Sequence, residues 1–331
     1  MPPSPSPAGQ AGAARATQAG APAPGPPGPQ RALAVATRLW PGARVSVELL
    51  AGGITNENFK VTVGAGSYVV RLFAPGAELL LIDRAAECEI TAAVARLGVG
   101  PEVVATLPDQ GALVTRFIEG RRVRAEQMAE RDVLRQVVRA LRLVHAEADA
   151  PKVLDPFRDI SSYSGGALSR GVETHPDFSW GTGLAREVQA LVGYCSTALC
   201  HGDLLNANFI QATDGIHIVD WEYAGQGDPL FDLANLSINH RFSPDDDAIL
   251  LELYQGHADE VSLARIRVLR FVSAVREAAW SYLQAAISPL DVDFTAYADG
   301  CLDTMRQAAA EPSFADALRL LRRSPAGGPA S

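Results

Sequence analysis

The hydrophobic positions of the chain follow two different periods, one in each of its two main parts. From Val45 to Ile118, short apolar runs recur as VSVELL, NFKVTV, SYVVRLF and ALVTRFI. The first three runs are joined by the Gly-containing turns AGGITN and GAGS, which is typical of antiparallel hairpins. The segment AAECEITAAVARLG interrupts them with apolar residues at helical spacing and with Gly98 as a stop signal. This part therefore predicts a small antiparallel sheet with one helix.

Helical spacing dominates after Gly120. Helix-compatible patterns recur near residues 125–146, 182–194, 230–240, 261–287 and 296–309. The exceptions are the segment from Cys200 to Ile210 and the run GIHIVDW. The whole pattern predicts an α+β fold, in which a small β-lobe is followed by a connector near residues 117–120 and a larger, mainly helical lobe.

The two ends of the chain differ in composition from the part between them. Residues 1–30 are almost entirely Pro, Ala, Gly, Ser and Gln, and the chain closes on SPAGGPAS. Such segments bury too little apolar surface to offset the entropy lost on ordering. We therefore predict a disordered tail over 1–30, lobes over 31–119 and 120–323, and a flexible tail over 324–331.

Composition and charge exclude several classes of function. A chain of 331 residues that is 47% hydrophobic can bury a large core. The formal net charge of -9 argues against a general nucleic-acid or anionic-membrane binder, because both need a basic face. A nucleotide remains compatible with this charge, since a few local cations and amides suffice for a triphosphate.

Cysteine and histidine spacing point to neither a disulfide framework nor a zinc site. Four scattered cysteines form no C-x-x-C pair, and six histidines form no H-E-x-x-H motif. The start of the chain lacks the order of a secretory signal, and no apolar run is long enough to cross a bilayer. These features predict a cytoplasmic location.

The polar motif with the clearest chemistry is HGDLLNANF, followed by IVDWE. Asp203 and Asn208 lie five residues apart in a predicted loop, and Asp220 follows a short β-run. Two acids and an amide can converge there. Phosphoryl transfer needs such a set, because one carboxylate orients the attacking hydroxyl and other oxygens bind Mg²⁺.

This H-x-D-x-x-x-x-N arrangement resembles the catalytic and metal-binding loops of the kinase-like superfamily. The version here, HGD with DWE, is similar to the branch that holds aminoglycoside phosphotransferases and choline kinases. The resemblance implies a protein-kinase-like fold that binds ATP and Mg²⁺ between its lobes. It also implies that Asp203 is the catalytic base, that Asn208 and Asp220 are Mg²⁺ ligands, and that His201 is structural.

The first lobe carries a matching nucleotide segment. LAGGITNENF is a Gly-containing turn without the G-K-[ST] of a Walker A motif, and it resembles the GG-x-[ST]-N loop of choline kinases. The resemblance places Gly52, Gly53, Thr55 and Asn56 at the nucleotide. Farther on, GVGPEVVATLPDQGALVTRFIEG resembles the family's G-x-x-P segment, strand pair and connector, with backbone groups of residues 115–117 facing adenine.

Arg71 stands where most kinases of this superfamily have Lys, and choline kinases are similar in having Arg there. An arginine can bind phosphate oxygens in a bidentate manner. Glu87 on the following predicted helix is the candidate ion-pair partner that positions Arg71, and Glu89 is its rival. Both Arg71 and Glu87 therefore belong to the predicted nucleotide site.

The acceptor pocket is predicted from two C-terminal patterns. DWEYAG resembles the choline- and thiamine-kinase branches, and W-S-x-x-Q-x-x-I-S with a later Tyr resembles choline and ethanolamine kinases. In that family, aromatic faces bind a quaternary ammonium through cation–π attraction. The resemblance implies a substrate pocket formed by Glu222, Tyr223, Glu277, Trp280 and Tyr297. Glu277 stands in place of a family aromatic residue, which leaves ethanolamine or another amine open.

The sequence thus predicts a small-molecule kinase that transfers the γ-phosphate of ATP to the hydroxyl of an amino alcohol. Choline and ethanolamine are the leading candidates for this acceptor. A thiamine kinase, an aminoglycoside kinase and a catalytically inactive nucleotide-binding protein remain as alternatives. The oligomeric state stays open.

Overall fold

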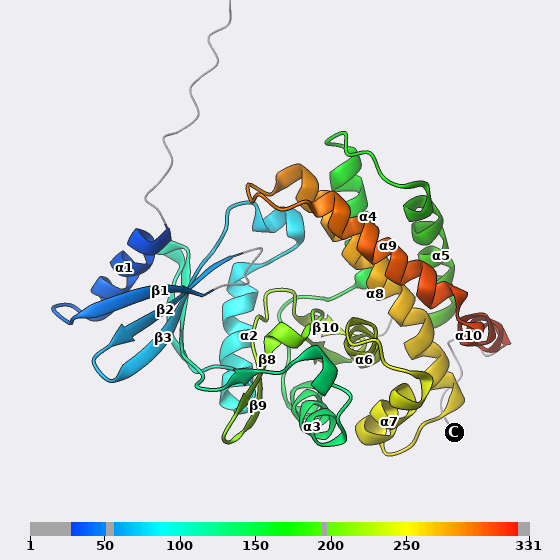
Figure 1. Ribbon diagram of the computed structural model, residues 1–331, viewed down its shortest axis with the longest axis horizontal. Coiled ribbons are helices and arrows are strands. Elements are labelled where there is room, and N and C mark those ends of the chain that lie inside the picture. The colour runs from blue at the N-terminus through cyan, green and yellow to red at the C-terminus, as the bar shows by residue number, and fades with distance from the viewer. Residues whose placement is uncertain (1–27, 51–55, 194–196, 324–331) are drawn as a thin grey trace, which may run out of the picture.

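The computed structural model describes residues 28–50, 56–193 and 197–323 (Figure 1). They form a small β-lobe beside a larger, mainly helical lobe, so the predicted two-lobed α+β fold is confirmed. Gly52, Gly53 and Thr55, three of the residues predicted to contact a nucleotide, lie outside the described residues.

The β-lobe is built on a five-stranded antiparallel sheet with the spatial order β1-β2-β3-β5-β4. Its strands are β1 (Val45–Leu50), β2 (Glu57–Val63), β3 (Gly66–Leu72), β4 (Val103–Leu107) and β5 (Ala112–Arg116). The predicted apolar runs coincide with β1, β2, β3 and β5. The remaining strand, β4, completes the strand pair that the family resemblance implied.

Helix α1 (Gly28–Leu39) covers the sheet, and the sequence pattern did not predict it. Its buried residues Ala32, Val35 and Ala36 recur at helical spacing and belong to the same hydrophobic cluster as Phe59 and Val61 of β2. The helix begins at Gly28, so residues 28–30 are helical rather than part of the predicted tail.

Helix α2 (Arg84–Arg96) is the predicted helix between β3 and the strand pair. Asp83 caps its N-terminus by accepting hydrogen bonds from the backbone N–H groups of Ala85 and Ala86. The helix ends before Gly98, whose φ of 72° is the left-handed conformation that favours glycine. The predicted stop is therefore confirmed.

The helical lobe surrounds one long, buried helix. Helix α8 (Glu260–Ile287) packs against α4, α5, α6, α7, α9 and α10. The helices of this lobe are α3 (Arg131–Glu147), α4 (Pro156–Leu168), α5 (Pro176–Val192), α6 (Pro229–Asn239), α7 (Pro244–Gln255), α8, α9 (Phe294–Ala310) and α10 (Pro312–Arg323). The sequence pattern predicted α3, α5, α6, α8 and α9, and it missed α4, α7 and α10.

Among the missed helices, α4 has a weak local signal, whereas α7 carries a capping box at Ser243 and α10 is clearly amphipathic. Helix α4 reads PFRDISSYSGGAL, whose serines and glycines lower intrinsic helix propensity. The cap at Asp155 and the contact with α8 stabilise it. In the described part of the chain, none of the helices combines the length and apolar character that a membrane span requires.

Two small sheets place the polar motif at the junction of the lobes. Strand β7 (Ala198–Cys200) pairs with β10 (Gly225–Gly227). Strands β6 (Arg121–Arg122), β8 (Phe209–Ala212) and β9 (Gly215–Ile218) form the second sheet. Because β8 and β9 are a hairpin, the residues that flank it, Asn208 and Asp220, return to the same place.

Candidate active site

The segment His201–Asp203 follows β7 directly and is held by its own histidine. The His201 ring donates from Nε2 to the carbonyl oxygen of Val219 at 3.0 Å and accepts at Nδ1 from the backbone N–H of Asp203 at 3.2 Å. Burial lowers the pKa of His201, which keeps the ring neutral, as one donor and one acceptor nitrogen require. The predicted structural role of His201 agrees with this geometry.

Asp232 of α6 braces the same segment from behind. Its carboxylate accepts hydrogen bonds from the backbone N–H groups of His201 at 2.7 Å and Gly202 at 2.8 Å, and from Nε2 of His145 at 3.1 Å. Although burial opposes ionisation, the bonds from His145 and His201 hold the pKa of Asp232 below its usual value.

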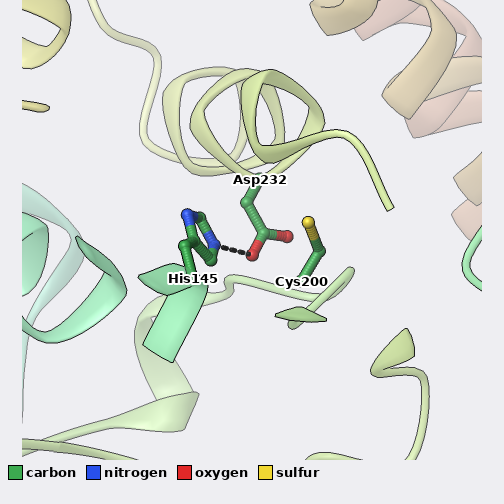
Figure 2. Close-up of side chains that lie close together, drawn as sticks. All are labelled: His145, Cys200 and Asp232. Carbon is green, nitrogen blue, oxygen red and sulfur yellow. Dashed lines mark hydrogen bonds and ion pairs between the residues drawn. The ribbon is translucent and has the colours of Figure 1, made fainter. Parts of the chain in front are cut away.

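Asp232, His145 and Cys200 also lie close enough to suggest a metal site (Figure 2). The atoms that could bind a metal ion already take part in hydrogen bonds within the protein. Nδ1 of His145 lies 2.8 Å from the hydroxyl of Tyr254, and the thiol of Cys200 lies 3.6 Å from the carbonyl oxygen of Ala198. The cluster is therefore a buried hydrogen-bonded brace for the loop rather than a metal centre.

Two further side chains fix the loop, and sequence analysis assigned them no role. Asn235 accepts a hydrogen bond from the backbone N–H of Leu204 at 2.6 Å. Arg276 of α8 donates to the carbonyl oxygen of Gly202 at 2.9 Å and to Asp159 at 2.9 Å. Neither residue has a partner nearby in the sequence that could have indicated this role, because each bonds to a loop at least 31 positions away.

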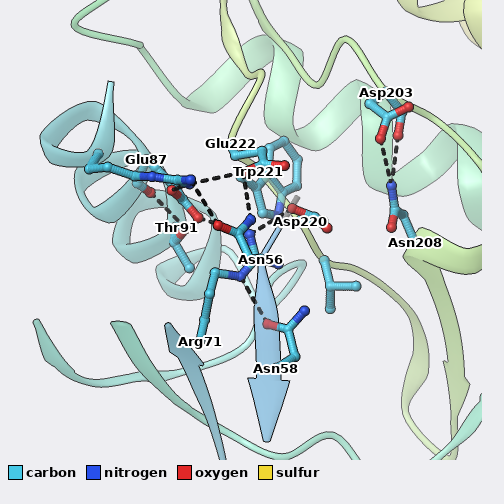
Figure 3. Close-up of polar contacts among 12 residues, drawn as sticks. Asn56, Asn58, Arg71, Glu87, Thr91, Asp203, Asn208, Asp220, Trp221 and Glu222 are labelled. Carbon is cyan, nitrogen blue, oxygen red and sulfur yellow. Dashed lines mark hydrogen bonds and ion pairs between the residues drawn. The ribbon is translucent and has the colours of Figure 1, made fainter. Parts of the chain in front are cut away.

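Asp203 and Asn208 form the next part of the site. The amide nitrogen of Asn208 donates to the main-chain oxygen of Asp203 at 2.9 Å and to its carboxylate at 3.3 Å. The amide oxygen of Asn208 consequently points away from Asp203 (Figure 3). Burial, with the nearby charges of Glu277 and Asp220, raises the pKa of Asp203 to about 8.

Asp220 has an unusual backbone conformation. Its φ of 71° lies in the left-handed region, which is uncommon for residues other than glycine and is found at functional sites. Its carboxylate accepts a hydrogen bond from Nη1 of Arg71 at 2.6 Å. Although burial opposes ionisation, the charge of Arg71 lowers the pKa of Asp220.

Arg71 links the β-lobe to this carboxylate (Figure 3). The same Nη1 that donates to Asp220 also contacts Glu87 of α2 at 2.9 Å, and Nε donates to Asn58 at 3.2 Å. Glu87 is almost fully buried, whereas Glu89 is exposed. The structure therefore pairs Arg71 with Glu87 and not with Glu89.

A second arginine, Arg84, repeats this pattern and was missed by sequence analysis. Its Nη1 contacts Glu87 at 2.7 Å and Glu222 at 2.8 Å, and its Nη2 donates to Asn56 at 2.8 Å. Asn56 in turn donates to Glu222 at 2.7 Å. Burial, with the charge of Asp220, raises the pKa of Glu222 to about 7. Arg71 therefore contacts Asn58 and Asp220, whereas Arg84 contacts Asn56 and Glu222. Both arginines contact Glu87.

A cavity of about 440 Å³ separates the lobes, and we call it the inter-lobe cavity. Arg71, Glu87, Asn208 and Asp220 line its polar end, and the connector residues 115–118 line another part. The backbone N–H groups of Arg116 and Phe117 donate to Glu102 and Ser67, so these two amides are already used within the β-lobe.

A smaller cavity of about 120 Å³ adjoins it, and we call it the acceptor cavity. It is lined by Asn56, Asn58, Asp203, Leu205, Ala207, Asn208, Asp220, Glu222, Tyr223, Arg276, Glu277, Trp280 and Tyr297. All five residues predicted for the substrate pocket are in this lining. Asn58, Ala207, Asn208 and Asp220 line both cavities.

The oxygen donors at this shared wall suit a hard divalent cation. Asn208 presents an amide oxygen and Asp220 a carboxylate, and Mg²⁺ is bound through few protein oxygens together with phosphate oxygens. The residues present therefore fit the predicted Mg²⁺ site.

Comparison with known proteins identifies the family of this chain. The model of the phosphotransferase enzyme family matches residues 46–269. Protein LicA of Haemophilus influenzae is 27% identical over 242 residues, which are 70% of this chain and 71% of that protein. A probable ethanolamine kinase of Arabidopsis thaliana is 25% identical over 291 residues, 76% of each chain.

Among solved structures, a choline/ethanolamine kinase family protein of Mesorhizobium loti superposes with a TM-score of 0.74 at 29% identity, covering 89% of this chain and 98% of that one. Choline kinase LicA of Streptococcus pneumoniae shares the fold with a TM-score of 0.70 at 20% identity, covering 84% and 99%. Because the family model spans more than half of the sequence, the chain belongs to the phosphotransferase enzyme family.

Proposed function

We propose that this protein transfers the γ-phosphate of ATP to the hydroxyl of a small amino alcohol, choline or ethanolamine, with the help of Mg²⁺. The observation that carries the proposal is the wall shared by the two cavities. Asn208 and Asp220 line both cavities, while Asp203 lines only the acceptor cavity. A terminal phosphate in the inter-lobe cavity would therefore lie beside a hydroxyl held at Asp203.

In this arrangement the protein acts mainly by positioning and by neutralising charge. Asp203 orients the hydroxyl of the acceptor and takes its proton, and a pKa near the working pH suits a general base. Arg71, held by Glu87, binds phosphate oxygens. Asn208 and Asp220 would hold Mg²⁺, which supplies positive charge against the phosphate oxygens.

The acceptor cavity supports a cationic acceptor. Asp203, Asp220, Glu222 and Glu277 supply four carboxylates, and Tyr223, Trp280 and Tyr297 supply aromatic rings. The similarity to a probable ethanolamine kinase and to a choline/ethanolamine kinase family protein supports such a substrate. The same carboxylates would also suit an aminoglycoside, which makes that class the second candidate.

The test is ATP-dependent phosphorylation by the purified protein across choline, ethanolamine, thiamine and an aminoglycoside panel, with Mg²⁺ and with EDTA. We expect turnover of choline or ethanolamine that EDTA abolishes. Asp203→Ala should remove transfer while ATP binding, followed by calorimetry, persists. The exposed Asp245→Ala serves as the control and should behave as wild type.

Two results would contradict the proposal. Turnover of thiamine or an aminoglycoside alone would show that the protein is a kinase whose acceptor is not an amino alcohol of the proposed class. A folded Asp203→Ala variant that loses nucleotide binding as completely as transfer would remove Asp203 from its role as base.

A further inference from the structure

The acceptor cavity contains two carboxylates that form no ion pair within the described part of the chain. Asp220 is paired with Arg71, and Glu222 with Arg84. Arg276 also lines the cavity, but its guanidinium bonds go to Asp159 and to the carbonyl oxygen of Gly202. Asp203 serves the hydroxyl of the acceptor in the proposed reaction, so Glu277 is left for a cation that the acceptor itself supplies.

Glu277 faces the cavity from α8 and is oriented by α9. One of its carboxylate oxygens accepts a hydrogen bond from the hydroxyl of Tyr297 at 3.0 Å. The hydroxyl fixes that oxygen without neutralising the charge, because a phenol is an uncharged donor. Asp203 and Glu277 line the same cavity of about 120 Å³. One small molecule can thus reach Asp203 with its hydroxyl and Glu277 with its nitrogen.

The aromatic rings of the cavity are largely occupied by protein groups. The guanidinium of Arg276 lies over the Tyr223 ring, 5.4 Å from its centroid, and the Tyr223 hydroxyl accepts from the indole nitrogen of Trp280 at 2.7 Å. Trp280 is only 6% exposed and packs edge-on against Phe294 and Tyr297. Few ring faces remain to surround a quaternary ammonium.

We infer that Glu277 determines acceptor specificity, and that it selects an alcohol whose ammonium group keeps at least one N–H. This inference rests on the amino-alcohol kinase function proposed above. A protonated primary, secondary or tertiary amine donates directly to a carboxylate in a short, charge-assisted hydrogen bond. A quaternary ammonium has no hydrogen to donate, and its methyl groups hold the nitrogen away from the carboxylate, so the attraction is weaker.

The experiment uses four acceptors that differ by one methyl group at each step: ethanolamine, N-methylethanolamine, N,N-dimethylethanolamine and choline. The decisive step is the last one, because only it removes the final N–H. For wild type we expect kcat/KM to fall by about tenfold or more at that step, the loss of one charge-assisted hydrogen bond. The earlier methylations should change kcat/KM less.

Three variants locate the effect at the carboxylate. Glu277→Gln keeps the shape and removes the charge, and it should raise KM for the three N–H acceptors and reduce the dimethylethanolamine-to-choline ratio toward one. Tyr297→Phe removes the hydroxyl donor and keeps the charge, so the N–H preference should persist. Glu89→Gln makes the same chemical change at an exposed position and should leave all values at wild type.

The outcomes separate this inference from the function on which it rests. If choline is used as well as or better than dimethylethanolamine by wild type, or if Glu277→Gln lowers kcat/KM equally for all four acceptors, the inference is wrong and the kinase function stands. If none of the four is phosphorylated while ATP still binds, the proposed function fails and the inference with it.

Discussion

Asp203 carries an unfavourable charge in the folded protein. Burial, together with Glu277 and Asp220, raises its pKa from the ordinary value of a carboxyl to about 8. Between pH ~4 and ~8 the folded state therefore keeps a proton that the unfolded state has released. The free energy of unfolding consequently falls as the pH rises through this window. Above the window, the buried charge of Asp203 destabilises the folded state to its full extent.

Asp203→Asn should remove this penalty. In metal-free buffer we expect the variant to melt above wild type at pH 8, by roughly 2–4 °C for each ~1 kcal/mol gained. The difference should shrink toward pH 4, where wild type is protonated as well. Thermal unfolding followed by circular dichroism at several pH values measures it, and an advantage that grows toward acid would contradict the assigned pKa direction.

At the scale of elements, helix α6 is tied to the loop after β7 through one carboxylate. Asp232 accepts from two backbone N–H groups and from His145, and it is fully buried. An amide in its place offers one acceptor oxygen and turns an N–H donor toward groups that are themselves donors.

Asp232→Asn should therefore destabilise the protein strongly. Leaving a buried donor or acceptor unsatisfied costs about 1–3 kcal/mol for each group, and urea unfolding should show a loss of at least this size. Asp245→Asn, an exposed change on α7, is the control and should stay within about 0.5 kcal/mol of wild type. A small loss at Asp232 would mean that the loop has other sufficient supports, such as Asn235 and Arg276.

For the whole molecule, the two lobes are joined at the site by two arginines that share Glu87. Arg71 reaches Asp220 and Arg84 reaches Glu222, so each arginine of the β-lobe holds one carboxylate of the helical lobe. Arg84 also holds Asn56, which belongs to the predicted nucleotide segment. The relative position of the lobes thus depends on buried ion pairs as well as on packing.

Arg84→Ala should raise KM for ATP by about tenfold, the effect of losing ~1.4 kcal/mol of nucleotide binding. The reason is that Asn56 loses an anchor and Glu222 loses its cation. KM for the acceptor should rise as well, because Asn56 and Glu222 both line the acceptor cavity. Arg96→Ala, at the exposed far end of α2, is the matched control. A variant in which kcat alone falls would place Arg84 in transition-state stabilisation instead.

Local signals in the amino-acid sequence were enough to predict several parts of this protein. Alternating apolar runs predicted four of the sheet strands, and helical spacing that ends at Gly98 predicted α2. The motif around Asp203, Asn208 and Asp220 could be recognised because a short hairpin brings its ends together, so sequence spacing alone implies proximity.

Tertiary structure decided the rest, because the contacts involved join residues far apart in the chain. Arg84 and Glu222 are separated by 138 positions, and Arg276 and Gly202 by 74. No spacing rule links such pairs. The choice of Glu87 over Glu89 depended on which side of α2 is buried. The lack of an ion pair at Glu277 is a result of the same kind, because the neighbouring Arg276 bonds to Asp159 and to the carbonyl oxygen of Gly202.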